Sequence, residues 1–197
     1  ENSTGERPVG PDWTSEGVPP GWGSWKIEPK AGKLYLDATR GHSGKVAAVL
    51  QGGGSMCYIA TIAVQTGKRY AAWVQTWATR SGGQHTSALD LRWQNKDGQW
   101  SNAERNRRTF ARQAGHWERL NVAGTAPDGA ARAVILLSAE GLEDTDRVWF
   151  DDAAFARTVP PGASADIEVI LRGKADVLRI PAYALLEGKR VLLLADD

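Results

Sequence analysis

Two neighbouring carboxylates, Asp151 and Asp152, follow an aromatic pair in the stretch TDRVWFDDAAFART at residues 145 to 158. Such residues serve as an acid/base pair, as metal ligands or as hydrogen-bonding groups at the end of a sheet. Successive side chains on a strand point to opposite faces, whereas a glycosidase needs two carboxylates about 5 to 9 Å apart around one bond. The pattern therefore argues against a catalytic pair. Calcium takes carboxylates and carbonyls from separate loops, so a metal role and a plain hydrogen-bonding role both stay open.

A second candidate set lies on two segments with strand-like alternation, 69–78 (RYAAWVQTWA) and 86–94 (TSALDLRWQ). Leu89, Leu91 and Trp93 form a wholly apolar side, which is expected to face the core. If the strands pair through a hairpin at TRSGGQH, the opposite face carries Trp73, Gln75, Trp77, Asp90, Arg92 and Gln94. Aromatic and polar groups together suit a sugar, whose C–H faces stack on rings while its hydroxyls need donors and acceptors. The alternative is a solvated sheet face with Trp73 covered by loops.

Other tryptophans are candidates for either contact or packing. Trp22 and Trp25 lie in PPGWGSW, and Trp100 follows the KDGQ turn. In a loop, each could contact a ligand or close the end of the sandwich. Trp117 and Trp149 lie in apolar alternation and are expected in the core.

The remaining polar residues give no catalytic signature. The stretch ERNRRTFARQ holds four arginines, which could bind uronates or sulfates or form a solvated edge strand: Arg105, Arg107, Arg108 and Arg112. The histidines, His42, His85 and His116, show no metal-ligand spacing. No nucleophile elbow or phosphate loop is present. A lyase using His85, Arg92 and Tyr70 stays as an alternative, but we expect no enzyme.

Composition excludes several classes of protein. The 197 residues carry a formal net charge of +1, so no global field attracts nucleic acid or anionic membrane. The single cysteine, Cys57, cannot form an internal disulfide and is expected to be a small buried residue. No apolar run is long enough for a membrane helix and no signal peptide is visible, so we expect a soluble chain in mature or trimmed form. Nine tryptophans with 22 glycines favour a sheet protein that recognises a ligand.

Short apolar runs separated by turn residues predict an all-β sandwich of two sheets. After an extended lead-in over 1–17, strands are expected near 33–37, 45–51, 57–64, 69–78, 86–94, 107–112, 116–122, 131–138 and 147–156. Residues 159–197 begin with a Pro-Pro-Gly entrance that marks a boundary, contain no tryptophan and are strongly aliphatic. Strands are expected there at 165–171, 176–180 and 190–194. This tail is too small for its own core, so we expect it to pack on the first domain, to pack on another chain through self-association or with a protein partner, or to belong to a larger domain.

Residues 18–158 resemble a jelly-roll carbohydrate-binding module. The resemblance is found in VPPGW, HSGKVAAVL, VQTGKRYAAWVQT, ALDLRWQNKDG, HWERLNVAGTAPDGAARAVILL and VWFDD, in that order. In that family the final Phe-Asp-Asp often helps to bind a structural calcium, together with an N-terminal acidic residue and oxygens near the HSGK turn. The resemblance thus implies a site at Asp151 and Asp152, with Asp12 or Glu16 standing where the family has its Phe-Glu pair.

Residues 160–197 are similar to the membrane-proximal barrel of periplasmic adaptor proteins of export pumps. PGASADIEVIL followed by VLRIPAYALLEGKRVLLL forms this second resemblance. It implies an alternative in which the sandwich is a protein-contact module and no sugar is bound. The main expectation is a non-catalytic domain that binds a polysaccharide or oligosaccharide outside the cytoplasm, in the periplasm or secreted.

Overall fold

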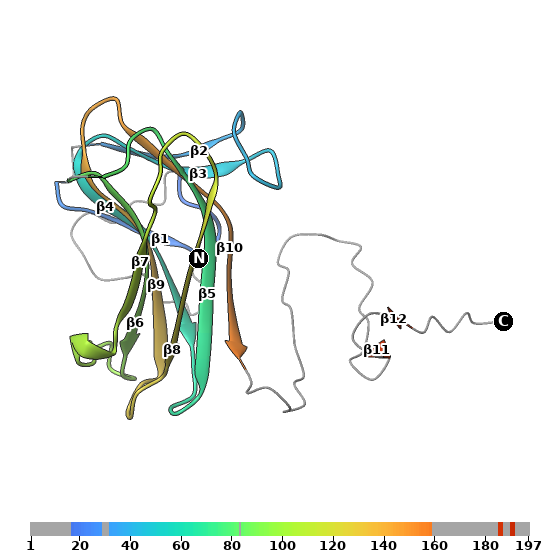
Figure 1. Cartoon of the computed structure of the whole chain (residues 1–197). Coiled ribbons are helices and arrows are strands. Elements are labelled where there is room, and N and C mark those ends of the chain that lie inside the picture. Colours follow the sequence, from blue (N-terminus) through green and yellow to red (C-terminus); the bar gives the residue numbers. More distant parts are fainter. Residues whose placement is uncertain (1–16, 29–31, 83, 159–184, 187–189, 192–197) are drawn as a thin grey trace. The chain divides into compact units, whose positions relative to one another are not determined.

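The computed structural model describes residues 17–28, 32–82, 84–158, 185–186 and 190–191. The chain divides into two compact units, Glu1–Thr158 and Val159–Asp197, and each is described by itself. In the first unit the described strands form two five-stranded antiparallel sheets (Figure 1). The prediction of an all-β sandwich is confirmed.

The first sheet, called sheet A here, has the strand order β1-β4-β9-β6-β7. Its strands are β1 (Gly23–Lys26), β4 (Gly54–Ala63), β9 (Arg132–Leu142), β6 (Thr86–Gln94) and β7 (Arg107–Phe110). Sheet B has the order β2-β3-β10-β5-β8. Its strands are β2 (Lys33–Asp37), β3 (Ala47–Gln51), β10 (Arg147–Thr158), β5 (Arg69–Ala78) and β8 (Glu118–Thr125). All the strands predicted for this unit form. β1 is an additional strand in a stretch for which the sequence predicts a loop.

The core lies between the two sheets, where apolar side chains from alternate positions meet. Leu89, Leu91 and Trp93 of β6 are fully buried in this core, as their alternation predicts. Val74 of β5 and Tyr58 of β4 belong to the same cluster. The predicted inward faces of β5 and β6 are therefore confirmed.

The predicted hairpin pairing of β5 with β6 is wrong. β5 pairs with β10 and β8 in sheet B, while β6 pairs with β9 and β7 in sheet A. An apolar strand face is buried between the sheets of a sandwich whichever sheet holds the strand, so alternation alone does not select the neighbouring strand. The outer faces of β5 and β6 consequently lie on opposite sides of the sandwich.

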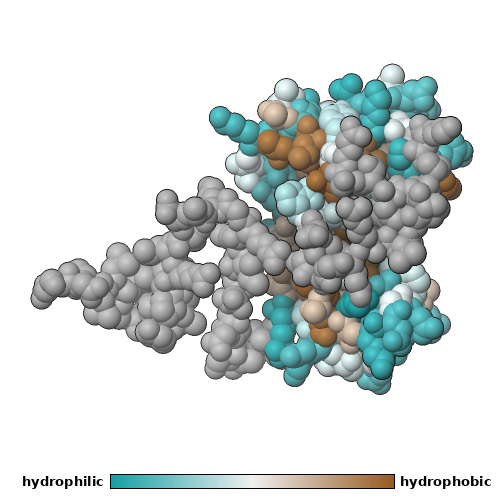
Figure 2. Space-filling model, turned by 180° about the vertical axis from the view of Figure 1, so that it is seen from behind, coloured by the Kyte–Doolittle hydropathy of each residue, from teal (hydrophilic) through white to brown (hydrophobic). Residues whose placement is uncertain are grey.

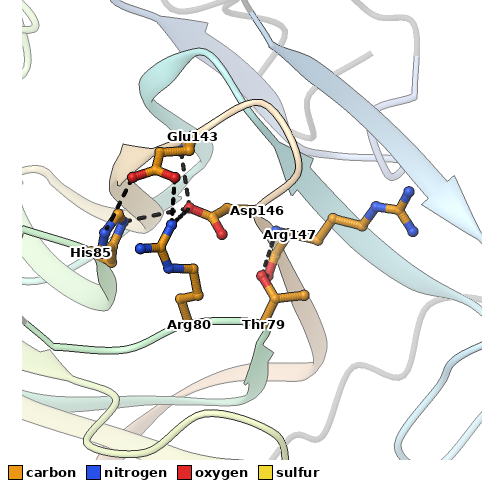
Figure 3. Close-up of polar contacts among 6 residues, drawn as sticks. All are labelled: Thr79, Arg80, His85, Glu143, Asp146 and Arg147. Carbon is orange, nitrogen blue, oxygen red and sulfur yellow. Dashed lines mark hydrogen bonds and ion pairs between the residues drawn. The ribbon is translucent and has the colours of Figure 1, made fainter.

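The connection from β5 to β6 crosses between the sheets. Its side chains form ion pairs with the loop that joins β9 to β10 (Figure 3). Arg80 Nη1 donates to Glu143 Oε2 at 2.6 Å and lies 3.5 Å from Asp146 Oδ2. His85 lies beside the same two carboxylates, with Nδ1 3.5 Å from Asp146 Oδ2. These contacts link the two connections to each other at one end of the sandwich.

A smaller apolar cluster covers part of the outer face of sheet B. Ala47, Val49 and Trp149 are its buried members, and the half-buried Tyr35, Trp77 and Trp117 pack against them. The Arg40 guanidinium lies 4.0 Å from the ring centroid of Trp77, in cation–π contact. Trp149 is thus buried as predicted, but outside the main core. Trp117 is only half-buried, at the edge of this cluster.

Asp37 anchors this cluster and gives a pH-dependent prediction. Its carboxylate accepts hydrogen bonds from Thr39 N and Oγ1 and, at 2.8 Å, from Trp149 Nε1. Hydrogen bonds from Thr39, and then from Trp149, lower the pKa of Asp37. Because the pKa of Asp37 is lower in the folded state, its charged carboxylate stabilises the fold fully above the unfolded-state pKa of about 3.9. This stabilisation is lost as the pH falls through the folded-state pKa of Asp37. We expect Asp37→Ala to lower the free energy of unfolding by about 1–2 kcal/mol at neutral pH, because the buried indole N–H loses its acceptor.

Urea unfolding of wild type and Asp37→Ala at neutral pH and near pH 3 measures this effect. The difference between the two proteins should narrow at the acid end. A difference that does not change with pH would contradict a role for the charged carboxylate.

The surface of the first unit mixes hydrophilic and hydrophobic residues. Seen from behind, brown hydrophobic residues interrupt the teal surface (Figure 2). The exposed large hydrophobic side chains among the described residues are Ile27, Leu36, Val46, Trp100 and Phe110. Of these, Trp100 belongs to the groove described below.

In the second unit, the structure describes only a short antiparallel pair, β11 (Leu185–Leu186) with β12 (Arg190–Val191). Part of the strand expected at 190–194 is therefore observed. The strands expected at 165–171 and 176–180 lie outside the described residues, as does most of the lead-in over 1–17. No helix in the described part of the chain is long and apolar enough to span a membrane.

Candidate functional site

A groove of about 920 Å³ runs along the outer face of sheet A. Its lining comes from β1, β4, β9, β6 and β7 and from the turn after β6. These strands present alternate residues to the core and to the groove, so one strand builds both. On β6, Leu89, Leu91 and Trp93 face the core, whereas Asp90, Arg92 and Gln94 line the groove.

The floor of the groove is apolar. Cys57 and Ile59 of β4 pack with Val134 and Leu136 of β9 in a buried cluster, and the half-buried Trp25 of β1 packs against them. Strand pairing places Ile59 beside Leu136 and Trp25 beside Cys57. Burial raises the pKa of the Cys57 thiol to about 12, so the thiol stays protonated and is no nucleophile. A floor of this kind can contact the C–H face of a bound molecule.

Asp90 lies beneath the polar side of the groove and holds two arginines. Only 4% of its side chain is exposed. Arg92 Nη2 donates to Asp90 Oδ1 at 3.3 Å, and Arg108 Nε lies 3.5 Å from Asp90 Oδ2. Ser138 Oγ donates to the same Oδ2 at 3.2 Å. Because the two guanidinium groups share this buried carboxylate, their positions in the groove are set before any ligand arrives.

The Arg108 guanidinium has further partners. It forms an ion pair with Glu140 and lies 4.8 Å from the ring centroid of Phe110. The side chains of Arg92 and Arg108 are 36% and 30% exposed, so both offer hydrogen-bond donors at the groove surface.

Tryptophans stand on two sides of the groove. Trp25 comes from the edge strand β1, and Trp100 follows a tight turn after β6. Asn95 organises that turn, since its Oδ1 accepts from the backbone N–H groups of Asp97 and Gln99. Trp100 is 56% exposed. An exposed ring held by an ordered turn is available for stacking.

The structure divides the sequence-predicted ligand set into three groups. Trp25, Asp90, Arg92, Gln94 and Trp100 line the groove. Trp73, Gln75 and Trp77 lie on the outer face of sheet B instead, where Trp73 has the Arg119 guanidinium 5.4 Å from its ring centroid. Trp22 packs against the main core. The prediction that β5 and β6 share one outer face is therefore wrong. Ligand binding by any of these residues stays a prediction.

Sequence reasoning missed the part of the groove that comes from β9 and β7. The run ARAVILLS of β9 is apolar at almost every position, so it gives no alternation that could separate the two faces. Arg108 was predicted only as one of four arginines in a cluster. The other three, Arg105, Arg107 and Arg112, do not line the groove.

The residues of the suggested lyase do not come together. Tyr70 faces the core, Arg92 lies on the outer face of sheet A, and His85 lies in the loop contacts of Figure 3. The lyase constellation is therefore wrong.

Both carboxylates at the end of VWFDD contact the HSGK turn. Asp151 Oδ2 accepts from the backbone N–H of His42 at 2.7 Å. Asp152 Oδ2 lies 2.6 Å from His42 Nδ1, and its Oδ1 accepts from Ser43 Oγ. The prediction that strand alternation sends the two carboxylates to opposite faces is wrong here. A bulge between Asp151 and Ala154 and a positive φ of 51° at Asp152 interrupt the alternation.

This arrangement does not fit a calcium site within the described residues. Each of the four carboxylate oxygens has a hydrogen-bond partner: Asp151 Oδ1 accepts from Asp152 N, and the others contact His42 or Ser43. Among the described residues no group of three His, Cys, Asp or Glu side chains could hold a metal ion. Asp12 and Glu16, the other expected ligands, lie outside the described residues.

Chelation tests the calcium hypothesis directly. A structural ion stabilises the folded state by mass action, so its removal lowers Tm. Because His42 and Ser43 already engage the carboxylates, we expect EDTA to leave Tm unchanged. A fall in Tm that added calcium reverses would show that an ion is bound and would contradict this expectation.

Comparison with known proteins identifies the fold. No protein-family model and no curated protein sequence matches the chain. Among solved structures, the chain is similar to TmCBM61 in complex with β-1,4-galactotriose, with 19% identity, a TM-score of 0.52 and coverage of 72% of this chain and 92% of that one. The CBM22-2 xylan-binding domain of Paenibacillus barcinonensis Xyn10C gives 12% identity, a TM-score of 0.51 and coverage of 72% and 94%.

The fold is that of carbohydrate-binding modules. At these identities the likeness concerns the fold alone. The enzymatically active domain of bacteriophage CBA120 tailspike protein 4 is also similar, with 11% identity and a TM-score of 0.56, but the match covers only 20% of that chain against 75% of this one. These similarities give no support to the adaptor resemblance of residues 160–197.

Proposed function

We propose that this protein is a non-catalytic carbohydrate-binding domain that holds an oligosaccharide or a polysaccharide chain in the groove of sheet A. The observation on which the proposal rests is the groove itself, with its apolar floor, its tryptophans and the guanidinium pair organised by Asp90. Sugars need this combination, because their C–H faces stack on apolar and aromatic surfaces while their hydroxyls need fixed donors and acceptors.

The fold of the neighbouring structures supports the proposal. TmCBM61 is described with a bound galactotriose and CBM22-2 as a xylan-binding domain. A domain of this kind meets its polysaccharide outside the cytoplasm, and secretion or a periplasmic location belongs to the same proposal. We favour this function over a protein-contact module because the groove combines an apolar floor with a few fixed polar groups, as small-molecule sites do.

Affinity electrophoresis against a panel of soluble polysaccharides tests the proposal. We expect retardation by at least one polysaccharide relative to a reference protein. The double variant Trp25→Ala/Trp100→Ala should migrate as if no polysaccharide were present, because both rings beside the groove are lost. The matched double variant Trp73→Ala/Trp77→Ala removes two tryptophans from sheet B and should be retarded like wild type. Migration unaffected by every polysaccharide would contradict the proposed function.

A further inference from the structure

The charged side chains of the groove are unequally exposed. Among the described lining residues, four are basic and three are acidic: Arg92, Lys96, Arg108 and Arg132 against Asp90, Asp97 and Glu140. Asp90 is buried beneath Arg92 and Arg108, so it offsets part of their charge but does not face a ligand. Glu140 pairs with Arg108. The lining therefore carries one more basic than acidic side chain, and the burial of Asp90 leaves the basic groups nearer to a bound molecule.

The cationic groups gather toward Trp100. Strand pairing places Arg132 of β9 beside Gln94 of β6, and Arg92 is two residues before Gln94 on the same groove face. The turn after β6 adds the exposed Lys96, and its Gly98 approaches the Arg132 guanidinium. Trp100 bridges back to Gln94. Arg92, Lys96 and Arg132 thus belong to the same end of the groove lining as Trp100, and Asp97 is the one carboxylate among the described groove residues of that turn.

Arg92 is partly exposed in the groove. Its Nη2 donates to Asp90 and 36% of its side chain is exposed, whereas its Nε is buried and out of reach of a ligand. Asp90 holds the guanidinium in place, so a carboxylate on a ligand meets a preorganised donor rather than a mobile side chain.

We propose that the groove prefers an acidic glycan, with the carboxylate of a uronic acid residue lying beside Trp100 and paired with Arg92 and Lys96. The proposal rests on the carbohydrate-binding function and adds the class of sugar. Charge-assisted hydrogen bonds from guanidinium and ammonium groups are stronger than those from neutral donors. These charge-assisted bonds make the groove prefer acidic over neutral sugars. Stacking on Trp100 contributes to the affinity for both kinds of sugar.

The test compares each acidic polysaccharide with its own neutral form. Polygalacturonate and glucuronoxylan are titrated into the full chain before and after chemical reduction of their carboxyl groups, at low and at high salt. For at least one of them we expect the acidic form to bind about tenfold tighter at low salt, and we expect salt to shrink this ratio. Lys96→Gln and Arg92→Gln should each bring the ratio close to one. Lys68→Gln, which removes an exposed lysine outside the groove lining, should leave the ratio unchanged.

The outcomes separate the two proposals. Equal binding of acidic and reduced forms would overturn the acidic preference while leaving carbohydrate binding intact. An acidic preference that survives in both Lys96→Gln and Arg92→Gln would also overturn it. Binding of a sulfated galactan without binding of either polyuronate would overturn the assignment to uronic acids. Binding of no glycan at all would overturn the proposed function itself.

Discussion

Trp100→Ala is expected to weaken binding of an oligosaccharide about tenfold to a hundredfold, while the protein stays folded. A buried aromatic contact at the centre of an interface contributes about 1–3 kcal/mol, and each 1.4 kcal/mol changes Kd tenfold. The Trp100 ring is 56% exposed without ligand, so its removal should change the free energy of unfolding by no more than about 0.5 kcal/mol. Isothermal titration calorimetry with a glycan identified by the polysaccharide panel measures the loss.

Trp73→Ala is the matched control for Trp100→Ala. It deletes the same side chain from the outer face of sheet B and should leave Kd unchanged. If Trp73→Ala weakened binding while Trp100→Ala did not, the ligand would lie on sheet B and the assignment of the groove would be wrong.

Trp93→Ala is expected to have the largest effect on stability, a loss of about 3–5 kcal/mol in the free energy of unfolding. Trp93 has no exposed surface, and its ring packs near Tyr70 and Gly124. Its Nε1 donates to the carbonyl oxygen of Arg105 at 3.1 Å, so truncation also removes the donor to that carbonyl. Chemical denaturation measures the loss.

Trp93→Phe provides the control for Trp93→Ala. It keeps most of the apolar volume and should recover a large part of the stability, while the hydrogen bond to Arg105 stays lost. A loss for Trp93→Ala below about 1 kcal/mol would contradict the burial of this ring in the core.

Much of the fold could be predicted from local alternation. The strands β2, β5 and β6 have the bounds expected from the sequence, and Leu89, Leu91 and Trp93 face the core as expected. Alternation shows which side of a strand is apolar and therefore buried, but it does not show which apolar surface buries that side. It could not state that β5 and β6 belong to different sheets, which is why Trp73 and Arg92 were wrongly placed on one face.

The site could be predicted only in part, for physical reasons that differ from strand to strand. β6 shows a polar outer face, so Asp90 and Arg92 were recognised. β9 is buried on both faces, so Val134 and Leu136 looked the same as core residues. In the middle of β10, the bulge and the positive φ of Asp152 break the alternation, and the residue types in FDDAAF do not predict a bulge at this position.

The most direct measurement of carbohydrate binding in the groove is a titration of ¹⁵N-labelled protein followed through its indole N–H resonances. On addition of a glycan identified by the polysaccharide panel, the resonances of Trp25 and Trp100 should shift in proportion to occupancy. Those of Trp73 and Trp77 on sheet B, and of Trp93 in the core, should stay in place. Shifts confined to Trp73 and Trp77 would contradict the account, because they would place the ligand on the opposite side of the sandwich.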